Sequence, residues 1–285
     1  MTVQIREDAH YLGKLDALKR RSPVLLQYAE DPERYAKEVL KVKWWEGQAA
    51  IARSVATAKR TLVKTGHGIG KSFVAAGIVN WWYDTRPDSI IVSTAPTYRQ
   101  VTAVLWREIR SQRRTKPLAD ISQIRDMSNP AHYAMGYTSA KNVRSDAYES
   151  QGAQGLHAKD LLAVLDEAGG VQPSVWQAFD GMAVGAGNHI LAIGNPTVNS
   201  GPFFEAARSD KWEVISISVL NHPNILAALE HKPDPYPGAV SMAWLGEKLA
   251  DPSWVAVIDE KEATSDCFEF QGVWYSPRPI AQSLI

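Results

Sequence analysis

The sequence predicts an α/β fold in which a mainly parallel sheet is flanked by helices, and three observations predict it. Apolar runs that fit strands alternate along the chain with stretches long enough for crossover helices. One run, residues 161–165, consists of aliphatic residues without alternation, which is typical of a parallel strand buried on both faces. A glycine-rich segment, residues 66–72, separates another apolar run from a helix-compatible stretch.

The expected elements follow in chain order. A helix-compatible stretch, residues 49–59, leads into the first apolar run. The strands are expected at residues 61–63, 89–96, 161–165, 189–196 and 211–219. The crossover helices are expected at residues 73–79, 97–112 and 173–182. Strands and helices in this order form a doubly wound sheet with right-handed crossovers.

Residues 66–72 read Gly-His-Gly-Ile-Gly-Lys-Ser, which is typical of a nucleotide-binding loop. Strand, glycine-rich turn and helix together aim backbone N–H groups and a helix N-terminus at polyphosphate. In this interpretation Lys71 reaches the β- and γ-phosphates of ATP, and the Ser72 hydroxyl holds Mg²⁺. The residues expected around the nucleotide are Thr65, Gly66, His67, Gly68, Ile69, Gly70, Lys71 and Ser72.

The spacing of this loop departs from the usual pattern. That pattern has a glycine at the position of Thr65, whereas here glycine comes one place later, at Gly66. Taken alone, an incidental glycine turn ahead of a helix explains the segment equally well. A second motif is therefore needed to support a nucleotide site.

Two acids supply that second motif, because Asp166 and Glu167 directly follow the buried strand at residues 161–165. The carboxyl ends of strands are where open α/β sheets bind ligands. Asp166 is expected to bind the Mg²⁺ hydration shell, and Glu167 to orient or deprotonate the attacking water. A surface pair that caps the next helix is the alternative, and the glycine-rich loop upstream favours the hydrolytic site.

Two polar residues extend the candidate site. Asn195 follows the strand expected at residues 189–196, where a γ-phosphate sensor would stand, although Gly-Asn-Pro is also a common turn. Gln48 precedes the first strand, and in several ATPase families a glutamine there reads the adenine edge through its paired donor and acceptor. Trp45 is a possible stacking or packing partner for that role.

A basic helix face is the one local feature that fits nucleic acid. Arg107, Arg110 and Arg114 have the i, i+3, i+7 spacing that brings side chains to one face of a helix. Such a face can grip a phosphate backbone or contact a neighbouring subunit. A solvated face, favoured near the helix C-terminus by the dipole, is an equally valid interpretation.

Composition narrows the class of protein. The chain has 285 residues, 45% hydrophobic and 22% charged, with a formal net charge of zero, so any surface for nucleic acid must be local. No apolar run approaches the ~18 residues of a membrane span, so no membrane partner is expected. Cys267 is the single cysteine, which excludes an internal disulfide and suits a reducing compartment.

The order of these motifs resembles the large terminase subunit of tailed bacteriophages. The motifs are Trp-x-x-Gln, Gly-His-Gly-Ile-Gly-Lys-Ser, Ser-Thr-Ala-Pro-Thr-Tyr-Arg-Gln, Gln-Gly-Leu-His-Ala ahead of Leu-Asp-Glu-Ala, and Ile-Gly-Asn-Pro-Thr with Gly-Pro-Phe-Phe. The resemblance runs over residues 44–212. It implies a P-loop NTPase of the additional-strand type with a catalytic glutamate, Glu167. It also implies phosphate and metal contacts for Lys71, Ser72 and Asp166, a coupling role for Asn195, and adenine reading by Gln48.

The resemblance also implies partners and a location. The motor would hydrolyse ATP with Mg²⁺ and thread double-stranded DNA into a procapsid through the portal protein. A homo-oligomeric ring and a small terminase subunit are the implied assembly partners. The implied location is the cytoplasm of the bacterial host, with transient binding at the portal vertex of the procapsid.

Two departures from the family pattern carry expectations of their own. Many members have an arginine finger just before the glycine that precedes the Asp-Glu strand, and here that place reads Gln154-Gly155. Arg144 is the substitute expected, with a surface charge as the alternative. Large terminases usually continue into a nuclease, but the acids at residues 259–269 have no alternating strands to carry them in this interpretation. Nuclease activity is not expected, and a separately encoded nuclease or a truncated chain would explain this.

Three regions follow from these observations. They are a helical N-terminal region at residues 1–43, a P-loop ATPase core at 44–220 and a small C-terminal lid or linker subdomain at 221–285, with a helix near 240–250. Two other functions remain open at this point. One is a helicase of the superfamily-two type, which lacks support from a second ATPase-like half. The other is a nucleotide-binding docking subunit with little turnover.

Overall fold

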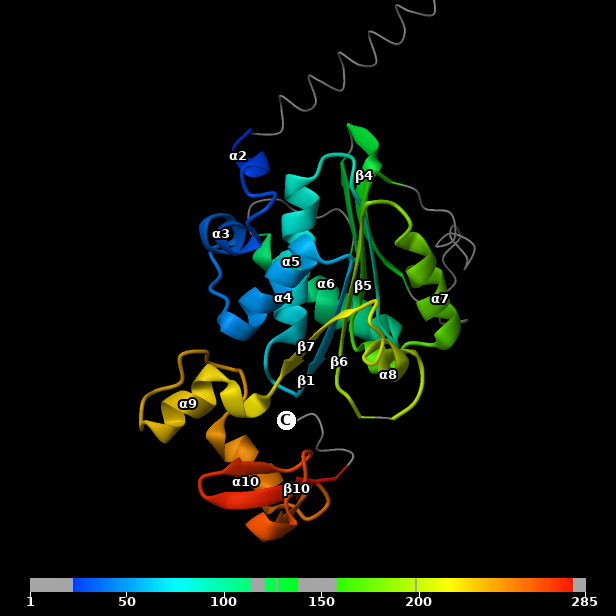
Figure 1. Cartoon of the computed structure of the whole chain (residues 1–285). Helices are drawn as coiled ribbons and strands as arrows, with labels where there is room; N and C mark the ends of the chain where they lie inside the picture. Colours follow the sequence, from blue (N-terminus) through cyan, green and yellow to red (C-terminus); the bar gives the residue numbers. More distant parts are fainter. Residues whose placement is uncertain (1–22, 114–120, 127, 138–157, 198, 279–285) are drawn as a thin grey trace, which may run out of the picture.

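The computed structural model describes residues 23–113, 121–126, 128–137, 158–197 and 199–278, and a seven-stranded sheet forms its centre (Figure 1). The strands are β1 (Arg60–Thr65), β2 (Ile90–Thr94), β3 (Gln123–Asp126), β4 (Asn129–Tyr137), β5 (Asp160–Leu165), β6 (Gly187–Gly194) and β7 (Glu213–Ile217). Their order across the sheet is β3-β4-β2-β5-β6-β1-β7.

The pairing of these strands decides the fold class. All neighbours are parallel except β3 and β4, which run antiparallel. β6 lies between β1, which leads into the glycine-rich loop, and β5, which ends at the two acids. The strand inserted between these two motifs is the additional strand that the sequence predicts, so the predicted fold class is confirmed.

Helices cover both faces of the sheet, as Figure 1 shows. One face is covered by α4 (Glu46–Thr57), α5 (Lys71–Thr85), the π-helical turn η2 (Gln100–Leu105) and α6 (Trp106–Gln112). The other is covered by α7 (Pro173–Met182) and α8 (Pro202–Ala206). A short 3-10 turn, η3 (Ala168–Gly170), connects β5 to α7.

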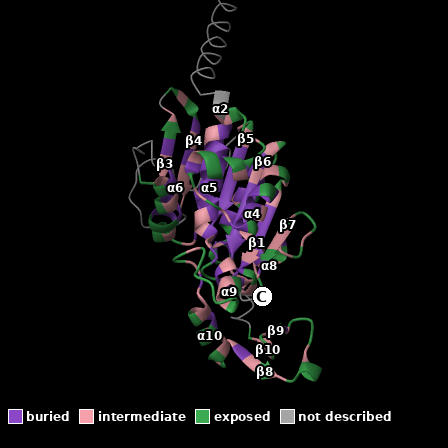
Figure 2. Ribbon diagram, turned by 90° about the vertical axis from the view of Figure 1, so that its left-hand side faces the viewer, coloured by how far each residue is buried: buried purple, intermediate pink, exposed green. Residues whose placement is uncertain are grey.

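The apolar run in β5 shows why its sequence lacks alternation. Leu162 and Val164 pack into the core on the α5 face, whereas Leu161, Ala163 and Leu165 pack into the core on the α7 face. All five are fully buried, and the sheet forms the buried centre in Figure 2. A strand buried on both faces needs apolar residues at every position.

The N-terminal segments fasten to α5. They are α2 (Pro23–Leu26), α3 (Pro32–Tyr35) and the π-helical η1 (Ala36–Leu40). The Tyr35 hydroxyl donates to Asp84 Oδ2 at 2.6 Å, and buried Arg113 donates to Asp84 Oδ1 at 2.9 Å. This network ties α3 and the end of α6 to the last turn of α5.

The C-terminal region is mixed rather than helical. After η4 (Val219–Asn221) it contains α9 (Pro223–Leu229), α10 (Met242–Ala250), β8 (Val255–Ile258), η5 (Glu260–Glu262), β9 (Phe268–Phe270) and β10 (Val273–Pro277). The strands form an antiparallel sheet in the order β8-β10-β9. The expectation that no strands carry the acids near residues 259–269 is therefore wrong, because Glu269 lies in β9.

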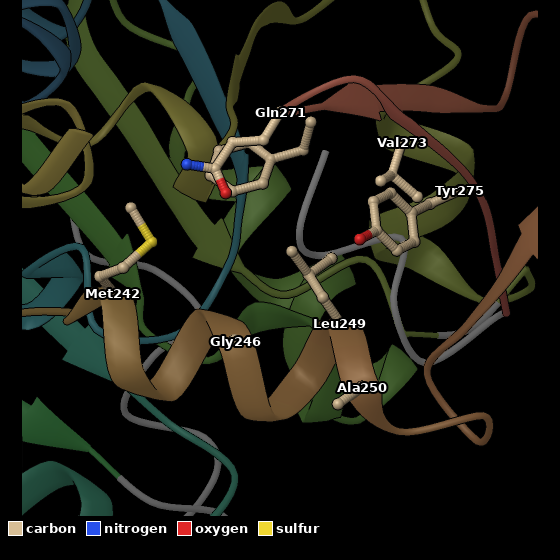
Figure 3. A pocket seen from close by; sticks show the side chains of 8 residues that line it. Met242, Gly246, Leu249, Ala250, Gln271, Val273 and Tyr275 are labelled. Atoms are coloured by element: carbon tan, nitrogen blue, oxygen red, sulfur yellow. The ribbon is translucent and has the colours of Figure 1, made fainter.

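A two-residue turn explains this difference. Gln271 and Gly272 join β9 to β10 with φ values of 53° and 79°, the left-handed geometry of a tight hairpin. Gln-Gly is a weak sequence signal for such a turn, and β9 is only three residues long. Between this hairpin and α10 lies a groove of about 430 Å³, lined by Met242, Leu249 and Tyr275 (Figure 3). No helix of the described residues is long and apolar enough to span a membrane.

Candidate active site

The glycine-rich loop lies between the end of β1 at Thr65 and the start of α5 at Lys71. Gly68 and Gly70 have φ values of 75° and 83°, a conformation that favours glycine. At Gly70 a Cβ atom would also collide with the Gln48 amide. The loop is thus shaped by backbone that no other residue type would hold without strain, and the N-terminal turn of α5 faces the space in front of it.

Lys71 is held at the centre of the site. Its side chain is only 7% exposed, and its ammonium donates to Gly66 O at 3.0 Å and to Asn195 Oδ1 at 2.8 Å. The Glu167 carboxylate lies 3.9 Å away. Burial lowers the pKa of the Lys71 ammonium, and the two nearby carboxylates oppose that shift.

Ser72 and Asp166 present oxygen atoms to one another. The Ser72 hydroxyl donates to Asp166 Oδ2 at 2.9 Å, across from the start of α5 to the end of β5. Asp166 is 1% exposed, and burial together with the Glu167 charge raises its pKa to about 6. A hydroxyl and a carboxylate that converge in this way are the hard oxygen donors that Mg²⁺ requires, so the pair fits the expected metal contact. A bound cation would also offset the cost of charging so buried a carboxylate.

Glu167 departs from ordinary backbone geometry. Its φ of 48° lies in the left-handed region, and its N–H donates to Asp166 Oδ1 at 3.1 Å. A non-glycine residue in this region is uncommon, and such strain is concentrated at functional sites. The turn leaves the carboxylate partly exposed, facing Lys71, where it can reach a water in front of the loop.

Asn195 connects the loop to the tip of β6. Its Oδ1 accepts from Lys71, and its amide nitrogen lies 3.1 Å from His67 Nε2. Burial and the Lys71 charge lower the pKa of His67, which favours the neutral ring that can accept this bond. The sequence places His67 in the loop but gives no signal for its bond to Asn195.

Gln48 lies against the loop itself. It is 4% exposed, and its amide nitrogen donates to Ile69 O at 3.2 Å and to Gly70 O at 3.3 Å. Trp45 supports the same segment, since its indole N–H donates to Ile69 O at 3.3 Å. In this conformation both amide hydrogens of Gln48 are used to hold the loop.

One contact to the loop comes from the far end of the chain. The Val240 N–H donates to Gly68 O at 2.9 Å, and a Cβ atom on Gly68 would lie 3.1 Å from the Val240 side chain. Val240 belongs to the segment between α9 and α10. The sequence gives no signal for this contact, because neither residue belongs to a shared pattern.

The predicted arginines are divided. Arg144 and Arg114 lie outside the described residues. Arg107 is exposed beside Glu108, whereas the Arg110 guanidinium bonds to the backbone oxygens of Thr102 and Ile121. The structure therefore leaves the Arg107 guanidinium open to solvent and places that of Arg110 against the protein's own backbone. A DNA-binding face there stays a prediction.

The structure brings together residues that lie far apart in the sequence, and these form one site at the carboxyl ends of β1, β5 and β6. They are Thr65, Gly66, His67, Gly68, Ile69, Gly70, Lys71, Ser72, Asp166, Glu167 and Asn195, with Gln48 behind the loop. A strand-tip lysine, hydroxyl, carboxylate pair and amide can bind a polyphosphate and a hydrated cation and position a water.

Comparisons with known proteins agree with this geometry. The chain is 26% identical over 177 residues to a probable terminase large subunit of Enterobacteria phage P7, over 58% of this chain and 35% of that protein. The chain thus spans about a third of the length of this curated relative. No family model matches the chain.

Solved structures give the same result for the fold. The large terminase ATPase domain of Thermus phage P74-26 matches with a TM-score of 0.55 and 17% identity, over 78% of this chain and 94% of that one. The large terminase of bacteriophage HK97 matches with a TM-score of 0.52 and 11% identity, over 78% of this chain and 51% of that one. The large terminase of another thermophilic bacteriophage has a TM-score of 0.51 and 12% identity, over 64% of this chain and 47% of that one. Motifs, strand order and these comparisons together confirm the predicted resemblance: the chain is similar to the ATPase region of phage terminase large subunits.

Proposed function

We propose that this chain is the ATPase motor subunit of a phage terminase, which couples Mg²⁺-dependent ATP hydrolysis to movement of double-stranded DNA into a procapsid. The observation that carries the proposal is the convergence of Lys71, Asp166, Glu167 and Asn195 around one glycine-rich loop. Similarity to a probable terminase large subunit supports the packaging role.

The residues divide the chemistry of hydrolysis among them. Lys71 would exchange its bond to Gly66 O for the β- and γ-phosphate oxygens, where its charge stabilises the transition state. Ser72 and Asp166 would hold Mg²⁺ through the hydroxyl and the metal's hydration shell; the bound ion would neutralise phosphate charge. The Glu167 carboxylate would orient the attacking water and take its proton as the bond to the β,γ-bridging oxygen breaks. Asn195, bonded to Lys71, is placed to sense the terminal phosphate.

The partners are proposed from the resemblance. They are double-stranded DNA, a homo-oligomeric ring of this chain, a portal protein on a procapsid and a small terminase subunit, in the cytoplasm of a bacterial host. Arg144 is proposed to act on the ATP of a neighbour in the ring. We propose that DNA cutting belongs to another polypeptide or region; among the described residues no cluster of three or more acids, histidines or cysteines could hold a metal ion.

The Lys71→Ala variant tests the nucleotide site. It should bind ATP weakly and lose turnover, because the cation that offsets developing phosphoryl charge is gone. The control is Arg125→Ala, which removes an exposed cation on β3, and it should leave the ATPase rate unchanged. Equal turnover in Lys71→Ala and Arg125→Ala would overturn the proposal.

A second experiment tests the ring. We expect a dilute monomer to hydrolyse ATP slowly, because a missing arginine finger lowers the rate by ~10³-fold or more. Addition of portal-bearing procapsids should raise the rate, and Arg144→Ala should abolish that rise while ATP binding persists. Full-speed hydrolysis by the dilute monomer would contradict the ring, and Mg²⁺- or Mn²⁺-dependent nicking of DNA would contradict the assignment of cutting elsewhere.

A further inference from the structure

A crevice of about 580 Å³ opens beside the glycine-rich loop. Its walls come from the ends of β1 and β7, from α8 and the segment that follows it, and from the C-terminal sheet region. The lining includes Thr65, Phe204, Arg208, Ile217, Asp266 and Pro277. This size lies within the range of small-molecule sites, about 300–1,000 Å³.

One lining residue has an unused polar group. Thr65 is 2% exposed, and its hydroxyl is buried without a hydrogen-bond partner among the described residues. A buried hydroxyl left unpaired costs about 1–3 kcal/mol, so such groups are rarely kept without a ligand or water. Thr65 is also the position at which this loop departs from the usual glycine. The departure thus places a polar group at the crevice.

The strand order says which end of a nucleotide would reach this crevice. The hydrolytic residues Asp166, Glu167 and Asn195 follow β5 and β6, on one side of β1. The terminal phosphate must therefore lie on that side, with the loop after β1 around the inner phosphates. The rest of the molecule then extends past β1 toward β7, whose end at Ile217 lines the crevice.

The alternative place for the base is already filled by protein. Both amide hydrogens of Gln48 are bonded to Ile69 O and Gly70 O, and the residue is almost wholly buried. Reading a base through that amide would require breaking the bonds that shape the loop. The crevice needs no such change.

We propose that the crevice binds the nucleoside end of the nucleotide, a purine base with its ribose. The inference rests on the proposed function and adds the place of the base. The Phe204 ring and the Arg208 guanidinium, 5.4 Å from the ring centroid, offer a flat apolar and cationic surface for a base. The Thr65 hydroxyl and the Asp266 carboxylate supply hydrogen-bonding groups for the base edge and the ribose hydroxyls. Gln48 is then a positioning residue for the loop.

Comparison of ATP with inorganic tripolyphosphate tests this proposal, because tripolyphosphate has the phosphates without the nucleoside. We expect Arg208→Ala and Thr65→Val each to weaken binding of Mg²⁺-ATP by about tenfold and to leave the affinity for Mg²⁺-tripolyphosphate unchanged. Thr65→Ser keeps the hydroxyl and should restore ATP affinity. Gln48→Leu should weaken both ligands by the same factor, and the exposed control Arg125→Ala should change neither.

Each result separates the inference from the function on which it rests. If wild-type protein binds both ligands and Arg208→Ala and Thr65→Val change both equally or not at all, the crevice does not hold the nucleoside. If Gln48→Leu alone loses the preference for ATP over tripolyphosphate, the base lies at Gln48 and the proposal is wrong. If wild-type protein binds neither ligand, the proposed function itself fails and the inference fails with it.

Discussion

The contact between the C-terminal region and the loop depends on one buried asparagine, Asn224. Its amide nitrogen donates to Tyr236 O at 2.9 Å and to Val240 O at 3.0 Å, and its Oδ1 accepts from Tyr236 N at 3.0 Å. These bonds fix the segment whose Val240 N–H bonds to Gly68 O. Asn224 is fully buried, so no water replaces a lost partner without rearrangement.

We expect Asn224→Ala to lower the free energy of unfolding by about 3 kcal/mol, from three bonds at about 1 kcal/mol each. ATP affinity should fall as well, because Gly68 loses its fixed neighbour. Urea denaturation followed by circular dichroism measures the first effect, and titration calorimetry measures the second. The matched control is Asn221→Ala, an exposed asparagine on the adjacent turn. A loss below about 1 kcal/mol, equal to that of the control, would refute the view that these bonds hold the segment.

Three further predictions concern buried groups. His222 is 1% exposed, and burial lowers its pKa to about 4 from a usual 6.5, so unfolded chains take up its proton first; stability should fall by up to about 3 kcal/mol as pH drops from 6.5 to 4, and pH-dependent denaturation of His222→Asn should lack that part. Arg113→Ala should cost about 3 kcal/mol in urea denaturation, because it leaves the buried Asp84 carboxylate without its ion-pair partner, whereas exposed Arg34→Ala should cost well under 1. Gly70→Ala should abolish ATP binding in calorimetry while the far-ultraviolet circular dichroism persists, because the φ of 83° and the Gln48 amide both exclude a Cβ atom.

The core of the fold could be predicted because its signals are local. The uninterrupted apolar run of β5 and the loop between β1 and α5 each depend on neighbouring residues. α7 begins and ends where its sequence predicts, at Pro173 and Met182, since proline suits the first helical turn. The strand-tip positions of Asp166 and Asn195 then follow from the parallel sheet.

Other features could not be predicted because they depend on contacts distant in sequence. β3 and β4 have mixed burial at a sheet edge, where no clear alternation marks them. The short hairpin of β9 and β10 depends on a Gln-Gly turn. The contact of Val240 with Gly68 and the bonds from Gln48 to the loop exist only once the chain has folded. For Gln48, the residue was correctly placed beside the loop, yet the amide's partners are backbone oxygens.

The central claim is that Glu167 activates the water that hydrolyses ATP. The most direct measurement is single-turnover hydrolysis of Mg²⁺-ATP by Glu167→Gln, with ATP affinity determined on the same sample. The amide keeps the size of the side chain but cannot accept the water's proton, so ATP should bind as in the wild type while hydrolysis falls by about 10²-fold or more. Near-normal hydrolysis by Glu167→Gln would show that another group activates the water and would contradict the account.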